Sequence, residues 1–226
     1  MADTTVMMDA DPAQGSSLAG VIEFAFKKML QGIDGQLPAV VVGYDRQSNR
    51  ATVRPLISRL TTQGQQIERA TIASVPVLAL GGGEFGITFP LKAGDRGWIE
   101  SSDRDISLFM QSNETARPNT LRMHEFADGR FIPDLFSDFT LPAEHDGAML
   151  IQHKSGETRI VVKPDEIALR VGNASVVIAE ESITLSAGGQ VLSVGGGGAQ
   201  HNGVNIGATH KHGGIEPGTG TSGTPQ

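Results

Sequence analysis

Cysteine is absent from this chain of 226 residues, and aromatic residues are absent from its last third. A chain without cysteine has no disulfide, no zinc–thiolate site and no thiol nucleophile, which fits synthesis in a reducing cytoplasm. No run of about 18 apolar residues is present to span a membrane as a helix. The acidic start, residues 1–11, lacks the basic segment of a signal peptide, so we expect no ordinary secretory export.

Positive charge is also scarce. The formal net charge is −7 at pH 7, whereas a nucleic-acid-binding protein needs a basic face. We therefore expect no nucleic-acid partner.

The aromatic residues are distributed unevenly. All eleven lie at or before Phe139, whereas residues 140–226 hold 16 of the 29 glycines. Aromatic side chains bury the most area per residue in ordinary cores. The segment after Phe139 is therefore poorly suited to forming a compact domain from one chain.

Short apolar runs nevertheless recur in this segment, about 7 to 10 residues apart, with glycine-rich or charged turn signals between them. Within several runs apolar and polar residues alternate, which predicts strands with one apolar face. The runs are Met149–Ile151, Ile160–Val162, Ile167–Leu169, Val176–Ile178, Ile183–Leu185, Val191–Val194 and Val204–Ile206.

A single strip of short strands would leave one apolar face and two edges open, which favours aggregation. Three strips wound about one axis would cover the apolar faces and pair the open edges. We therefore predict that residues 141–207 form an intertwined trimeric β-helix, the shaft. The alternative is a single-chain β-meander that packs on the N-terminal domain.

Residues 1–35 are predicted to form a tail and an amphipathic helix over 17–31. Ser16 or Ser17 can cap its start, and Gly32 with Gly35 can end it. Its apolar face must pack against either its own domain or a partner, because a lone short helix is marginal in water.

Residues 36–140 are predicted to form an OB-fold barrel used as a collar. The expected strands contain 39–42, 51–54, 67–80, 85–89 and 97–100. Residues 117–139 are interpreted as a loop held by Arg, Asp and His hydrogen bonds, with phenylalanines filling the base of the barrel. His124 and Asp128 could form an acid–base pair, but no motif supplies a nucleophile, and we expect no enzyme.

The last segment, residues 208–226, contains His210 and His212. In a strand these two imidazoles would point to the same side, which favours metal binding. Two ligands make an incomplete site, and three copies meeting on a three-fold axis would supply six.

This order of parts resembles the central spike of contractile phage tails, the membrane-piercing needle tip of the baseplate. In the barrel the resemblance rests on Val53–Leu56, Val75–Val77, Pro90–Gly97, Asp103–Ile106 and Arg122–Pro133, and at the tip on His210–Gly214. The resemblance implies an all-β homotrimer, with N-terminal helix, OB-fold barrel and trimeric β-helix. Its tip would hold one iron ion per trimer through six histidines, His210 and His212 of each chain.

The resemblance also implies partners and a location. The partners would be a trimeric baseplate hub protein and the outer membrane of the host. The protein would be located in the baseplate of the virion, which is assembled in the host cytoplasm. Some members of the family carry calcium or chloride in the shaft, which this sequence does not place. The alternatives are the spike of a tailocin or of a type VI secretion-like machine, a metalloenzyme using His210 and His212, and a trimeric receptor-binding fibre or depolymerase.

Overall fold

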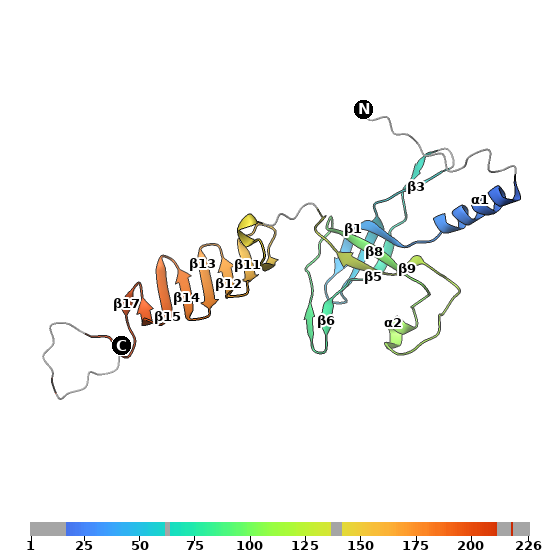
Figure 1. Ribbon diagram of the computed structural model, residues 1–226. Helices are drawn as coiled ribbons and strands as arrows, with labels where there is room; N and C mark the ends of the chain where they lie inside the picture. The colour runs from blue at the N-terminus through green and yellow to red at the C-terminus, as the bar shows by residue number, and fades with distance from the viewer. Residues whose placement is uncertain (1–16, 62–63, 137–141, 212–217, 219–226) are drawn as a thin grey trace, which may run out of the picture. The chain divides into compact units, whose positions relative to one another are not determined.

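The computed structural model describes residues 17–61, 64–136, 142–211 and 218 (Figure 1). The chain separates into two compact units, residues 1–138 and 139–226. In both units strands predominate, which confirms the prediction of a mostly β chain with few helices. Each unit is described by itself below.

Helix α1, Leu18–Gln31, begins and ends where the sequence predicts. The Ser17 side chain accepts a hydrogen bond from the Gly20 backbone N–H at 3.0 Å, and Gly32 ends the helix. Of the helix residues only Gly20 is buried among the described part of the chain. Of the two alternatives for its apolar face, packing on its own domain is therefore not seen among the described residues, and packing on a partner stays a prediction.

Five antiparallel strands form the main sheet of the first unit, in the order β5-β2-β1-β8-β9. They are β1 (Gln36–Asp45), β2 (Arg50–Pro55), β5 (Ile72–Pro76), β8 (Arg96–Ser102) and β9 (Glu125–Pro133). A parallel bridge between Val77 and Phe131 joins the two ends of this order, so the sheet is a nearly closed barrel. This five-stranded barrel occupies the place of the predicted OB-fold collar.

The interior of the barrel is filled by side chains that alternate along the strands. Each barrel strand contributes at least one, because inward and outward residues alternate in a strand. The buried residues are Ala39, Val41, Ala51, Val53, Val75, Val77, Ile99, Phe126 and Phe131.

Three sequence predictions for this unit are wrong in detail. Residues 67–80 do not form one strand, because within this range only Ile72–Pro76 is a strand of the five-stranded sheet. Residues 125–133 form strand β9 rather than a loop, because Phe126 and Phe131 enter the barrel core as part of a paired strand. Residues 85–89 do not join the barrel. Strand β7 (Phe85–Ile87) pairs instead with β6 (Leu80–Gly82) in a separate hairpin.

Two small elements complete the first unit. A second hairpin joins β3 (Arg59–Leu60) to β4 (Gln66–Ile67). The short helix α2 (Phe109–Ser112) lies in the long connection between β8 and β9.

The second unit begins with a 3-10 turn, η3 (Ala143–His145), and continues as eight strands in sequential order, each antiparallel to the next. Every apolar run found in the sequence lies in or overlaps one of them. The strands are β10 (Met149–Gln152), β11 (Thr158–Val162), β12 (Glu166–Val171), β13 (Ala174–Ala179), β14 (Ser182–Ala187), β15 (Gln190–Gly195), β16 (Gly198–His201) and β17 (Val204–Asn205).

Tight turns set the register of this meander. Between β14 and β15, Gly188 and Gly189 have φ of 56° and 78°. Two consecutive residues with positive φ match the turn whose twist suits a two-residue hairpin, and glycine adopts it without strain. One chain by itself therefore forms a β-meander, and the packing of this meander on the N-terminal domain stays a prediction. The trimeric β-helix concerns three chains and stays a prediction.

Candidate functional site

One face of the second unit's sheet is almost entirely apolar. Residues directly opposite each other on neighbouring strands share a face, and the pairing is continuous from β10 to β15. We call this the apolar face. It comprises Met149, Ile151, Ile160, Val162, Ile167, Leu169, Val171, Val176, Ile178, Ile183, Leu185, Leu192 and Val194.

The apolar face is open in the single chain. Met149 is 61% exposed and Val171 is 65% exposed, and most of the other side chains of the face are also exposed. A contiguous apolar surface of this kind marks an interaction site in a soluble protein. The opposite face is mixed. We call it the polar face because it carries Arg159, Arg170, Ser175, Thr184 and Ser193, and it also holds Leu150, Val161, Ala168, Val177 and Val191.

The far end of the meander is fixed by asparagine side chains. Asn202 lies in the turn between β16 and β17, where its amide donates to Gln190 Oε1 at 2.7 Å and its Oδ1 accepts from the Val191 N–H at 2.8 Å. Asn205 follows, accepting from the Gly207 N–H at 2.8 Å and donating to Thr209 Oγ1 at 3.0 Å. These bonds order the backbone up to the predicted metal ligands.

His210 is exposed, and its ring is oriented by this same backbone. Its Nδ1 lies 2.7 Å from the Gly207 carbonyl oxygen, so Nδ1 carries the proton and donates it. The lone pair of a neutral ring then resides on Nε2. Histidine ligands of metals commonly donate their other ring N–H to a carbonyl in this way.

His212, the second predicted ligand, lies outside the described residues. Within the described ranges of the chain, no three His, Cys, Asp or Glu side chains lie together as a metal-binding group. The predicted pairing of His210 with His212 is therefore untested by the structure.

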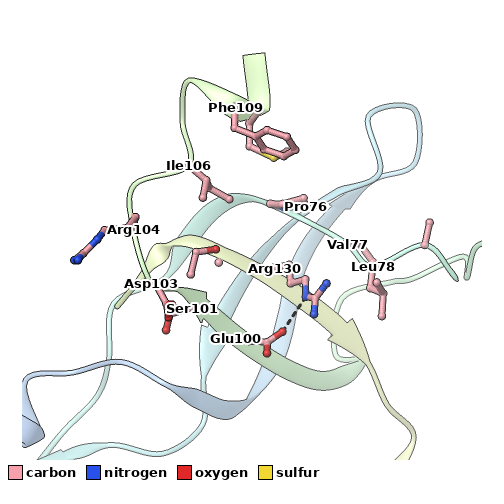
Figure 2. Close-up of a pocket in the computed structure, with 14 residues that line it drawn as sticks. Pro76, Val77, Leu78, Glu100, Ser101, Asp103, Arg104, Ile106, Phe109 and Arg130 are labelled. Carbon is pink, nitrogen blue, oxygen red and sulfur yellow. Dashed lines mark hydrogen bonds and ion pairs between the residues drawn. The ribbon is translucent and has the colours of Figure 1, made fainter. Parts of the chain in front are cut away.

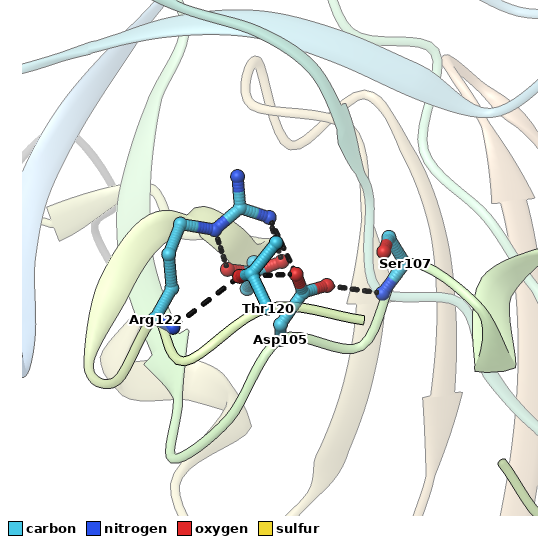
Figure 3. Close-up of polar contacts among 5 residues, drawn as sticks. Asp105, Ser107, Thr120 and Arg122 are labelled. Carbon is cyan, nitrogen blue, oxygen red and sulfur yellow. Dashed lines mark hydrogen bonds and ion pairs between the residues drawn. The ribbon is translucent and has the colours of Figure 1, made fainter. Parts of the chain in front are cut away.

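A buried polar cluster holds the long β8–β9 connection, and we call it the loop latch (Figure 3). Arg122 donates from Nε and Nη2 to the two carboxylate oxygens of Asp128 at 3.1 and 3.0 Å. The same Nη2 lies 3.2 Å from Asp105 Oδ2, which also accepts from the Thr120 hydroxyl at 2.7 Å. Both carboxylates are buried, and the single guanidinium bridges them.

The surroundings of Asp105 in the loop latch favour its ionised form. The polar atoms of Ser107 and the hydroxyl of Thr120 hold the pKa of Asp105 well below its usual range, and the Arg122 charge lowers it further. A carboxylate that accepts several hydrogen bonds keeps its charge in this way. An ionised Asp105, bridged to Asp128 by the Arg122 guanidinium, suits a structural role for the loop latch.

The sequence offered His124 and Asp128 as a possible acid–base pair, and the structure separates their roles. His124 Nδ1 lies 3.7 Å from Asp103 Oδ1, whereas Asp128 is held by Arg122. The expectation of a segment held by Arg and Asp hydrogen bonds is confirmed for Arg122 and Asp128.

A groove of about 710 Å³ lies beside this connection on the first unit (Figure 2). Ile106 and Phe109 form one wall, and Pro76, Val77 and Leu78 form the other. At the edge, Arg130 Nε donates to Glu100 Oε2 at 2.8 Å. No sequence pattern singled out this groove, because its walls come from segments that are distant in the chain.

Among the described residues, no helix has both the length and the apolar character needed to cross a membrane.

Comparison with known proteins finds a family match within the first unit. Residues 37–134 match the model of a family described as the phage protein Gp138 N-terminal domain. The match begins in β1 and ends just after β9, so it covers the barrel and the loop latch and leaves the second unit outside. No curated protein matches the chain. The family match supports a phage structural protein and a virion-associated component.

Proposed function

We propose that this chain is the central spike of a contractile tail baseplate, a homotrimer that pierces the outer membrane of the host. It has no catalytic role in this proposal. The sheath supplies the work, and the spike contributes stiffness and slow unfolding. The match of residues 37–134 to a phage domain supports the setting.

The observation that carries the proposal is the open apolar face. Burial of apolar area is worth roughly 25 cal/mol per Å². The six strands β10 to β15, which expose one apolar face, therefore forgo much of the free energy that would hold them folded. Two further copies, each presenting the same face to a common axis, would cover it. Its members are aliphatic and without aromatic rings, and therefore suit a slender interior.

The first unit would serve as the collar. Helix α1 exposes an apolar side that includes Leu18, Ile22 and Met29. Its opposite side carries the Glu23–Lys27 ion pair at 2.8 Å. This two-sided helix and the barrel are the parts that would attach the spike to a trimeric hub protein.

The tip would be fastened by a metal ion. His210 and His212 of three copies would provide six neutral imidazoles, a donor set that suits iron better than tetrahedral zinc. The Nδ1–H of His210, directed to the Gly207 carbonyl, fits this role because it leaves Nε2 as the ligand atom. The ion would join three chain ends that lack an apolar core of their own.

The metal can be tested by elemental analysis of the purified protein. We expect about one iron per three chains, and loss of that iron in the double variant His210→Ala/His212→Ala. His153→Ala is the matched control, because His153 is an exposed histidine of the same unit. Unchanged iron in the double variant would refute the tip assignment.

A further inference from the structure

A cluster of incompletely paired polar groups lies on the polar face, at the start of the second unit. Gln152, Arg159 and Arg170 are direct partners on β10, β11 and β12. Their side chains therefore lie next to each other on one face. Two arginines in directly opposed positions repel each other unless an anion lies between them.

The turn η3 adds an imidazole to this cluster. The His145 side chain is only 9% exposed, and both ring nitrogens are buried without a hydrogen bond in the described part of the chain. Glu144 Oε1 lies 3.3 Å from His145 Nε2 and 3.5 Å from Arg159 Nη2. The imidazole and the Arg159 guanidinium therefore lie close to the same oxygen atom.

Several nitrogen atoms and one acceptor oxygen of the cluster lack a hydrogen-bond partner among the described residues. Arg159 Nη1 donates to the Gly156 carbonyl at 3.2 Å, but Arg159 Nε is buried without a partner among the described residues, as is Gln152 Oε1. Arg170 is half-buried and makes no hydrogen bond or ion pair with the described residues. A buried donor without an acceptor costs about 1–3 kcal/mol, so the cluster is poised for an external acceptor.

The surrounding carboxylates do not supply the missing hydrogen-bond acceptor. Glu144 is 63% exposed and reaches Arg159 only at 3.5 Å. Glu166, also on β12, lies 3.8 Å from Lys163. The cluster therefore keeps an excess of positive charge over its nearest acids.

We propose that His145, Gln152, Arg159 and Arg170 form a binding site for a phosphate-type oxyanion. Gln152, Arg159 and Arg170 are neighbours on three adjacent strands, and His145 on η3 lies close to the Glu144 oxygen that Arg159 also reaches. A tetrahedral oxyanion can accept from all of them, whereas a planar carboxylate offers two oxygens only. Guanidinium groups bind phosphate oxygens in pairs, and the amide of Gln152 can be reversed to donate.

The ligand has two possible sources, inorganic phosphate and the phosphate of a lipid headgroup. The site lies within one chain, so it stands apart from the proposed trimer and its metal. A negative result for phosphate binding would therefore leave the proposed trimer and its metal unaffected, and the reverse also holds.

Calorimetric titration of the full-length protein with inorganic phosphate tests the site. We expect saturable binding that sodium chloride of equal ionic strength does not reproduce. In Arg170→Gln the affinity should fall at least about tenfold, the worth of one charge-assisted hydrogen bond. Lys163→Gln is the matched control, because it removes the same charge from the turn between β11 and β12 and should change affinity less than about twofold.

Two results would overturn the site: absence of saturable phosphate binding in the wild type, or equal affinity in Arg170→Gln and the wild type. Circular dichroism of Arg170→Gln establishes that the sheet is retained. Sedimentation with phosphatidylcholine vesicles, with and without phosphatidic acid, then separates the sources. Binding that needs phosphatidic acid and Arg170 assigns the lipid headgroup, and phosphate binding without vesicle binding assigns the free ion.

Discussion

Val77 and Phe131 form a parallel bridge, and the neighbouring Leu78 N–H donates to the Phe131 carbonyl at 2.8 Å. Strands β5 and β9 are the two ends of the five-stranded order, so this contact brings the sheet close to a closed barrel. Phe131 contributes twice, since its backbone makes the closing bond and its side chain is fully buried in the core. Barrel closure removes the open edges that would otherwise promote aggregation.

Replacing Phe131 with alanine should destabilise the first unit by about 3–5 kcal/mol, because the substitution leaves a cavity in the closed core. Urea unfolding followed by Trp98 fluorescence measures this locally. Phe85→Ala is the control, because Phe85 is 86% exposed, and it should change stability by less than about 0.5 kcal/mol. Equal effects of the two substitutions would contradict the assigned core.

The loop latch predicts a specific acid dependence. The folded-state pKa of Asp105 is lowered, so its stabilising contribution is fully present above the unfolded value of about 3.9 and is lost as pH falls toward the folded pKa. Asp105→Asn should therefore be less stable than the wild type at pH 5, and the difference should shrink at pH 3. A constant difference in unfolding free energy at the two pH values would show that Asp105 is not held ionised.

Helix α1 should contribute little to the stability of the first unit. Ile22 and Met29 are exposed, so Ile22→Glu/Met29→Glu should change the unfolding free energy of the barrel by less than about 0.5 kcal/mol. The same substitutions should weaken attachment to a hub. Barrel destabilisation by several kcal/mol in urea would show instead that the helix packs on its own unit.

The two faces of the meander should respond oppositely to charge. Val176 lies on the apolar face and Ser175, its neighbour, on the polar face. Val176→Asp should abolish self-association, because it places a carboxylate in the interface, whereas Ser175→Asp should leave it intact. Sedimentation equilibrium of the two variants measures this. Self-association that survives Val176→Asp would exclude the apolar face as the interface.

Much of the fold was predictable where local patterns decide it. The N-cap at Ser17, the stop at Gly32 and the alternation of the short apolar runs each rest on nearby residues, and the structure confirms them. Strand β9 was missed because its Gly129 and charged residues resemble a loop. Its pairing with β8 is decided by the tertiary burial of Phe126 and Phe131.

The polar sites were less accessible to sequence reasoning. Asp105 and Arg122 are 17 positions apart, and only the fold of the β8–β9 connection joins them in the loop latch. Strand β16 contains none of the apolar runs, and it is defined by its pairing with β15, beside which Asn202 Oδ1 accepts from the Val191 N–H. The His210–Gly207 bond depends on a local turn that no spacing rule specifies.

The mass of the native protein in solution tests the central claim most directly. The proposed spike predicts a particle of about three times 23.8 kDa, measured by native mass spectrometry, with the additional mass of one iron ion per particle. A monomer of 23.8 kDa that stays folded and soluble would contradict the covered apolar face, the shaft and the metal-fastened tip together.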